Sequence, residues 1–167
     1  PMKTITLTVN GTPVTAAVEP RTQLADFVRD HLLLTGTHVG CEHGICGVCT
    51  VLIDERSARS CLTLAVQVDG AHVTTVEGLR NRDSGELHPI QQAFIDGHGL
   101  QCGFCTPGFL MSTLELLRNT PEPTDEQIKE ALGGVLCRCT GYQNILESVK
   151  LAASRAASRR VSSRLSA

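Results

Sequence analysis

Three cysteines in a glycine-containing loop, followed by a fourth further along, are the residues best suited to chemistry in the first half of the sequence. They follow the pattern C-x4-C-x2-C…C, the ligand spacing of a plant-type [2Fe–2S] cluster. Thiolates are soft ligands that suit the iron of such clusters. Glycines at positions 40, 44 and 47 can adopt positive φ and let the main chain approach closely. We therefore predict a first [2Fe–2S] cluster held by Cys41, Cys46, Cys49 and Cys61.

Three other uses of these cysteines are less favoured. A structural zinc site usually pairs one C-x2-C with a second short pair of Cys or His, whereas here a single C-x2-C precedes a lone Cys61. Disulfides are not expected, because the sequence shows no signal peptide and its length needs no covalent staples. A Rieske site would need a second Cys–His pair, so His43 is predicted to be a loop residue covering the cluster.

A second set of four cysteines lies in the second half of the sequence. Cys102 and Cys105 form a C-x2-C pair, and Cys137 and Cys139 form a C-x-C pair. Two helices and a turn between the pairs would bring both to the same end of an antiparallel bundle. The four thiolates are then predicted to hold a second cluster, while the ligand chemistry alone leaves zinc open as an alternative.

Composition excludes several broad classes of function. The chain has 167 residues, a formal net charge of −2 and 19% charged residues, so nothing marks it as a nucleic-acid-binding protein. No apolar run approaches the roughly 20 residues of a membrane span, and the N-terminus reads as a strand rather than a signal sequence. Aromatic residues make up only 3%, so bound clusters are expected to supply part of the folding energy. These features predict a cytoplasmic metalloprotein.

The first half of the sequence alternates strand and helix signals. Residues 4–9 alternate apolar and polar side chains, an Asn-Gly pair then gives a strong hairpin signal, and residues 14–18 continue as the return strand. A helix is predicted over residues 22–33, with Thr22 as its N-cap. The remaining predicted elements of this half are strands over 48–53 and 71–76 and an apolar turn over 61–66.

The second half carries helical signals. The predicted helices cover residues 88–97, a segment opened by Thr106 as N-cap and Pro107, residues 127–132 behind a capping box at Thr124, and a segment from a capping box at Thr140 through Ala153. Four short helices with short connections predict a small bundle.

A polar stretch divides the two halves and sets the predicted domain boundaries. Residues 1–77 form the first domain, residues 78–86 a linker and residues 87–167 the helical domain, so the fold class is α+β. The basic tail is predicted to be a solvated or frayed end rather than a docking site; its arginines are Arg155, Arg159, Arg160 and Arg164.

Three motifs in order along the chain carry a resemblance to a known family. They are the Cys41–Cys49 run, the sequence QCGFCTPG from Gln101 and the sequence LCRCTGY from Leu136. Over about residues 3–155, with all eight cysteines matching, the chain resembles the small iron–sulfur subunit of molybdenum hydroxylases. That family includes carbon monoxide dehydrogenase, xanthine dehydrogenase, aldehyde oxidoreductases and N-heteroaromatic hydroxylases.

The resemblance implies a fold, cofactors and partners. It implies a β-grasp, plant-type ferredoxin-like domain followed by a four-helix bundle, each with a [2Fe–2S] cluster. The helical-domain cluster would face molybdopterin in a large subunit and the other cluster FAD in a medium subunit, in a dimer of heterotrimers. Gln101 would touch the pterin cofactor, and Cys139 would lie on the electron path from the pterin. Arg138 and Tyr142 either position the loop or are merely solvated.

The expected function is electron transfer without bond chemistry in this chain. Single electrons would pass from the molybdenum site through both clusters to flavin, with an aldehyde, an N-heteroaromatic compound or carbon monoxide as substrate of the complex. Two other classes remain open. One is a free-standing two-cluster ferredoxin electron carrier, although the helical domain argues against it because residues 1–76 alone would suffice for a ferredoxin. The other is a structural zinc module of a larger assembly. Phe104, where a tyrosine also occurs in such loops, does not identify the substrate.

Overall fold

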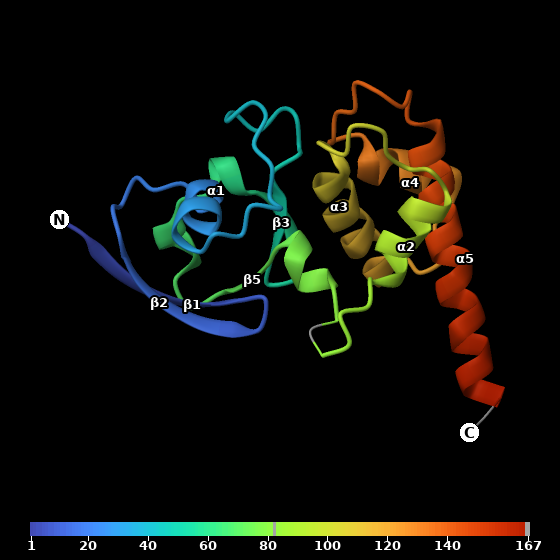
Figure 1. The fold of residues 1–167 in the computed structure, drawn as a ribbon, viewed down its shortest axis with the longest axis horizontal. Helices are drawn as coiled ribbons and strands as arrows, with labels where there is room; N and C mark the ends of the chain where they lie inside the picture. The colour runs from blue at the N-terminus through green and yellow to red at the C-terminus, as the bar shows by residue number, and fades with distance from the viewer. Residues whose placement is uncertain (82, 166–167) are drawn as a thin grey trace.

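The computed structural model describes residues 1–81 and 83–165, with side chains described through Ser158 apart from residue 82. The fold is mixed α+β, with a five-stranded sheet in the first half and most of the helices in the second (Figure 1). The sheet order is β2-β1-β5-β3-β4, in which β1 and β5 are parallel and the other neighbours antiparallel. The strands are β1 Lys3–Val9, β2 Thr12–Val18, β3 Thr50–Ile53, β4 Arg56–Arg59 and β5 His72–Thr74.

The predicted N-terminal hairpin is confirmed. Asn10 and Gly11 connect β1 to β2 with φ of 49° and 78°, as a two-residue type I′ turn requires. The Asn10 side chain also accepts a hydrogen bond from the backbone N–H of Thr75 at 2.8 Å, which ties the turn to the segment after β5. The buried residues of β1 alternate, as predicted, and are Ile5, Leu7 and Val9.

The helix predicted over residues 22–33 is wrong in its start and its length. α1 covers only Leu24–Asp26, and a π-helical stretch, Phe27–His31, follows it. Thr22 is not the N-cap; the next residue is, and it makes no side-chain capping bond. The segment before α1 stays extended because the first N–H of α1 donates to the carbonyl of Thr63 at 2.7 Å. Pairing with a distant segment therefore overrides the local helix signal.

The other predicted elements of this half are close to those observed. β3 begins at Thr50 and β5 ends at Thr74, so both strands are shorter than predicted. The apolar turn that carries Cys61 is a 3₁₀ turn over Ser60–Leu62, followed by a second one over Ala65–Val68. The sequence does not predict β4, which joins the sheet by pairing with β3.

Helices dominate the second half at the predicted places. One face of α3 is buried through Leu110, Leu114 and Leu117, which recur at helical spacing. In the described residues, α2 packs against α5 and α3 against α4, with further contacts from α2 to α3 and α4 to α5. The helices are α2 Pro89–Asp96, α3 Thr106–Asn119, α4 Asp125–Leu132 and α5 Gln143–Leu165.

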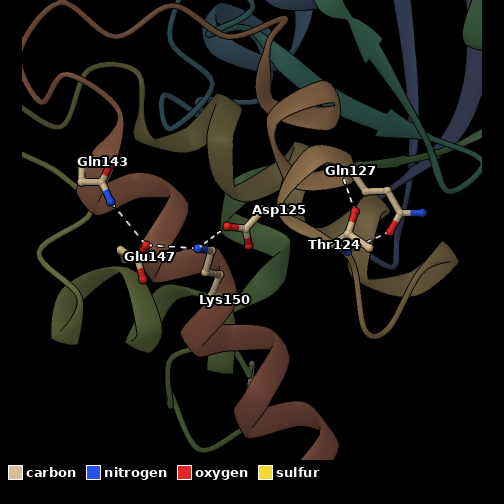
Figure 2. Close-up of polar contacts among 6 residues, drawn as sticks. All are labelled: Thr124, Asp125, Gln127, Gln143, Glu147 and Lys150. Atoms are coloured by element: carbon tan, nitrogen blue, oxygen red, sulfur yellow. Dashed lines mark hydrogen bonds and ion pairs between the residues drawn. The ribbon is translucent and has the colours of Figure 1, made fainter.

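The capping box predicted for α4 is confirmed. Thr124 Oγ1 accepts the backbone N–H of Gln127 at 3.3 Å, and Gln127 Oε1 accepts that of Thr124 at 2.8 Å (Figure 2). Figure 2 also shows Lys150 of α5 reaching Asp125 at the start of α4, with Nζ 2.7 Å from Oδ2. The same Nζ lies 3.2 Å from Glu147 Oε1, so one surface ammonium joins two helices.

The other two threonine caps predicted in this half are wrong. Thr106 lies inside α3, because its N–H already donates to the carbonyl of Gly103 and Cys105 occupies the N-cap position. Thr140 lies before the start of α5, and its hydroxyl accepts the N–H of Tyr142 at 3.0 Å instead of capping the helix. The Thr140 hydroxyl is used within the cysteine loop, which local propensity does not anticipate, whereas the Thr106 hydroxyl is buried without a hydrogen-bond partner among the described residues.

α5 runs well beyond the predicted end at Ala153 and reaches Leu165. Arg155 of the basic tail is not merely solvated, because its Nη1 lies 2.6 Å from Asp96 Oδ2 at the end of α2. The side chains of the other tail arginines, Arg159, Arg160 and Arg164, lie outside the described residues. Within the described chain, no helix combines the length and apolar character needed to cross a membrane.

The two halves share part of their core. One buried cluster belongs to the sheet and α1 and includes Leu24, Phe27 and Val51. The larger cluster is mostly helical, but Val48 and Leu52 of the first half also belong to it. The sheet and the helices are therefore packed as one body at the level of β3 and α3, which fixes the relative position of the cysteine loops described next.

Candidate metal centres

The first cysteine loop, residues 41–49, winds tightly because several of its residues adopt positive φ. Glu42, Gly44 and Gly47 have φ of 57°, 80° and 72°. A Cβ on Gly44 would lie 2.3 Å from Leu62 Cδ1, and a Cβ on Gly47 would lie 2.0 Å from the carbonyl oxygen of residue 134. Only glycine satisfies both the backbone conformation and the space at these two positions.

The four predicted thiols of the first group lie near one another as two pairs. The backbone N–H of Cys46 donates to Cys41 Sγ at 3.3 Å, and this N–H is the main reason that the pKa of Cys41 falls to about 6. Cys61 is brought back beside Cys49 by its neighbour Ser60, whose Oγ donates to the Cys49 carbonyl at 2.7 Å. Burial, and then the adjacent Cys49 thiol, raise the pKa of Cys61 to about 11.

The four predicted thiols of the second group also lie as two pairs, contributed by the loops before α3 and before α5. Cys102 Sγ and Cys139 Sγ lie 3.3 Å apart. Burial, and then a contact with Cys137, raise the pKa of Cys105 to about 12. The pKa of Cys137 is lowered although burial opposes the change, because Thr140 offers its hydroxyl at 3.2 Å and its N–H at 3.5 Å.

The thiols of each group approach one another in pairs. The pairs are Cys41 with Cys46, Cys49 with Cys61, Cys102 with Cys139, and Cys105 with Cys137. Among the described residues, no three Cys, His, Asp or Glu side chains converge as they would around one metal ion. Four thiolates arranged as two pairs, one pair for each iron, suit a two-iron cluster better than a single tetrahedral zinc. The donor chemistry and the glycine-lined approach of the first loop thus fit a [2Fe–2S] group.

The other predicted residues lie around the two groups. Gln101 is exposed next to Cys102, and Arg138 is also exposed. Tyr142 positions its loop, because its hydroxyl accepts the N–H of Cys137 at 2.9 Å and its ring packs edge-on against Phe109. The sequence shows the motif that contains Tyr142, but it does not predict the hydrogen bond between the Tyr142 hydroxyl and the N–H of Cys137.

His43, predicted as a loop residue, is exposed in the first cysteine loop. Its Nδ1 hydrogen-bonds the carbonyl of Cys41. This contact holds the ring against the main chain of the loop that carries the first three cysteines.

The two cysteine groups touch through their backbones, which the sequence does not predict. The loops that carry them lie along the same edge of the molecule (Figure 1). The N–H of Leu136, next to Cys137, donates to the carbonyl of Cys46 at 2.8 Å. On another side of the contact, the ring of His38 stacks on Phe104 at 5.0 Å and its Nδ1 lies 2.8 Å from the Phe104 carbonyl oxygen.

Comparison with known proteins gives the class first. Residues 7–75 match the family described as "2Fe-2S iron-sulfur cluster binding domain", and residues 75–150 match the "[2Fe-2S] binding domain" family. The chain is therefore an iron–sulfur protein with two successive [2Fe–2S] binding domains of different type.

Relatives then give the particular family. The chain is 56% identical to the nicotine 6-hydroxylase small subunit of Paenarthrobacter nicotinovorans over 87% of its own length and 86% of the relative's. It is 54% identical to the caffeine dehydrogenase subunit gamma of a Pseudomonas species, over 87% and 88%. In the crystal structure of quinoline 2-oxidoreductase from Pseudomonas putida, one chain superposes with a TM-score of 0.89 at 45% identity, over 95% of this chain and 97% of that one.

The chain belongs to the family of small iron–sulfur subunits of molybdenum hydroxylases. It is an iron–sulfur electron-transfer subunit of a molybdenum hydroxylase-type complex.

Proposed function

We propose that this chain relays single electrons from a molybdopterin site in a large subunit, through two [2Fe–2S] centres, to FAD in a medium subunit. Residues 1–77 hold the first centre and residues 87–167 the second, with 78–86 as linker. Burial of both Cys49 and Cys61 and the pairing of thiols in each group support this division. The proposed ligands are Cys41, Cys46, Cys49 and Cys61 for the first centre and Cys102, Cys105, Cys137 and Cys139 for the second.

The observation that carries the relay is the hydrogen bond between the two ligand loops. From the sulfur of Cys46, a path runs through its own carbonyl, across the 2.8 Å hydrogen bond to Leu136, and on to the sulfur of Cys137. A bound [2Fe–2S] centre supplies one-electron transfer at each end. The residues between provide a short and rigid link, because both loops are held by glycine contacts and by Tyr142.

The exposure of the second group supports the proposed orientation. Cys102 and Cys139 are exposed, and Gln101 lies beside them, so we assign this face to the large molybdopterin subunit and Gln101 to a pterin contact. Ile45 in the first loop and Leu62 beside it are 63% and 62% exposed. We assign this apolar surface to the medium FAD subunit, because exposed apolar patches commonly mark interfaces. The complete assembly is proposed to be a dimer of such heterotrimers.

For the substrate of the complex, we favour an N-heteroaromatic compound over an aldehyde or carbon monoxide. The support is in the names of the three relatives reported above, which concern nicotine, caffeine and quinoline. The substrate pocket itself is proposed to lie in the large subunit. The free thiols of the described cysteines suit a reducing compartment, so we propose that the complex works in the cytoplasm.

A redox titration of the full chain, prepared anaerobically and followed by EPR, tests the proposal. We expect two distinct [2Fe–2S] signals and about four irons per chain. One signal, or about two irons, would remove the two-centre relay. Size-exclusion chromatography from the native host adds a second test: we expect co-elution with a molybdenum-containing large subunit. Elution as a lone monomer would instead support a free-standing ferredoxin, and a colourless zinc-loaded protein would support a structural module.

A further inference from the structure

Arg59 lies where the two cysteine loops meet. It is the last residue of β4 and pairs across the sheet with Thr50, the first residue of β3. One arm of its guanidinium donates through Nη1 to Thr50 Oγ1, and the other donates through Nη2 to the carbonyl of Gly134 at 2.8 Å. The side chain therefore bridges the sheet and the segment that leads into the second cysteine pair.

The bridge extends into the first cysteine loop. Thr50 is buried, and its Oγ1 donates in turn to the carbonyl of Gly47 at 2.6 Å. Gly47 stands between Cys46 and Cys49, whereas Gly134 stands shortly before Leu136 and Cys137. A continuous run of three hydrogen bonds thus connects the two ligand loops through one guanidinium, beside the direct bond from Leu136 to Cys46.

The close approach of the two loops explains why this bridge can control their separation. A Cβ on Gly47 would lie 2.0 Å from the Gly134 oxygen and 2.9 Å from Val135 Cα, so the two backbones are already in contact. Residue 134 is itself a glycine, which leaves the path of its carbonyl weakly defined by local sterics. The rigid, planar donor fork of an arginine can fix two acceptors at a set separation, which the single ammonium of a lysine cannot do.

The charge of Arg59 is not neutralised by a carboxylate. Its hydrogen-bond partners, Thr50 and Gly134, are neutral oxygens, and no ion pair of Arg59 occurs in the part of the chain that the structure describes. Glu115 and Glu130 line the same cleft without pairing with it. An unpaired cation beside thiolate-bound clusters favours their reduced forms, since net charge and hydrogen bonding set their reduction potentials.

We propose that Arg59 is a positioning residue for electron transfer between the two centres. Its fork holds the Gly134 segment against the first loop, which keeps the hydrogen bond from Leu136 to Cys46 formed, and its charge raises the potentials of both centres. Each transfer would move one electron from a centre held at Cys137, which would be oxidised, to a centre held at Cys46, which would be reduced. This inference rests on the proposed relay function.

The test uses the full chain with both centres reconstituted, in three variants: R59M, R59K and R56M. Arg56 lies on the same strand and is exposed, so R56M removes the same charge without touching the bridge and serves as the matched control. The readouts are the midpoint potentials of the two centres and the magnetic splitting between them in EPR of the fully reduced protein. A merely structural role would lower thermal stability without moving either readout.

We expect R59M to weaken the splitting and to shift both potentials downward. R59K should keep the potentials close to those of the wild type but weaken the splitting, because it keeps the charge and loses the fork. R56M should change neither. The proposal would be overturned if the midpoint potentials and the magnetic splitting of R59M matched those of R56M. If R59M loses a centre, R59K decides instead, and an unchanged splitting in R59K would overturn the proposal. A wild-type chain without two centres would instead overturn the relay itself.

Discussion

The two cysteine groups are built from different parts of the molecule and differ in how much of the ligand set the chain encloses. In the first group Cys49 and Cys61 are 1% and 2% exposed, and they lie at the ends of the paired strands β3 and β4. In the second group only Cys105 is buried, while Cys102 and Cys139 are exposed at the ends of helix-connecting loops. With Cys41 and Cys46 half-buried, the first group is thus more enclosed by this chain than the second, which is open on one side.

The difference follows from what holds each group. The first group is tied to the sheet, because β4 pairs with β3 and carries the chain back from Cys49 to Cys61. The second depends on helix packing and on single side chains such as Tyr142, whose hydroxyl holds the Cys137 N–H. A centre made by loops between helices can present its ligands outward, which suits a partner that must approach closely.

Replacing one cysteine in each group should give the largest effect and the clearest contrast. We expect C49S to lose the first centre and to destabilise the chain strongly, because a buried hydroxyl costs about 1–3 kcal/mol in addition to the lost ligation. C139S should lose the second centre with a smaller fall in melting temperature, because the site is exposed. Iron analysis and thermal unfolding of both variants check this. Equal losses of stability would break the comparison.

The two centres should be lost at different rates when the metal is removed. When the isolated wild-type chain is exposed to air or to a chelator, we expect the second centre to disappear first, because its outer thiols are accessible to solvent. The decay of the two EPR signals measures this order. Simultaneous loss, or earlier loss of the first centre, would show that thiol exposure does not control lability. In the assembled complex the difference should shrink if a partner covers Cys102 and Cys139.

Glycines in the two loops give a smaller but sharper contrast. Gly47 and Gly103 both have positive φ, of 72° and 81°, but only the first faces a backbone at 2.0 Å, while nothing lies within 4 Å of the second. We expect G103A to lower the free energy of unfolding by about 1–2 kcal/mol, the cost of a left-handed backbone. G47A should cost more than about 3 kcal/mol, because the loops must also separate. Chemical denaturation of both variants measures the difference.

Similar losses in G47A and G103A would mean that the contact between the loops contributes little to stability. A loss of magnetic splitting in G47A, with both centres retained, would support a role for the contact in electron transfer. G11A offers a reference in the hairpin, because Gly11 also has positive φ and no neighbour within 4 Å.

The sequence indicates two cysteine groups through ligand spacing, which is largely a local property, and in the structure the thiols of each group approach one another in pairs. It predicts the hairpin for the same reason, since Asn10 and Gly11 suit the turn that the structure adopts. It does not predict β4: its residues have low strand propensity, and Asp54 and Glu55 form the preceding turn with φ of 47° and 68° without a glycine. Pairing with β3 supplies what propensity lacks.

The contacts between the two halves could not be predicted for a different reason. The bond from Leu136 to Cys46 and the bridge through Arg59 join residues that are distant in sequence and depend on how the sheet and helices dock. Thr140 does not cap α5, because the cysteine loop offers its hydroxyl another partner, the thiol of Cys137. Thr124 caps α4 as predicted, and it lies outside both cysteine loops.

The cap of α4 should have the smallest effect. T124A removes the acceptor for the Gln127 N–H, and we expect the free energy of unfolding to fall by between about 0.5 and 2 kcal/mol, the usual cost of losing an N-cap. Both EPR signals should stay unchanged, because α4 carries no ligand. K150M, which breaks the exposed pair with Asp125, is the control and should cost at most about 1 kcal/mol. If T124A weakened the EPR signal of the second centre alone, helix packing rather than the loop contacts would set the geometry of the second group. The difference between the two groups would then lie in the stability of the helices that hold the second group, compared with the sheet that holds the first.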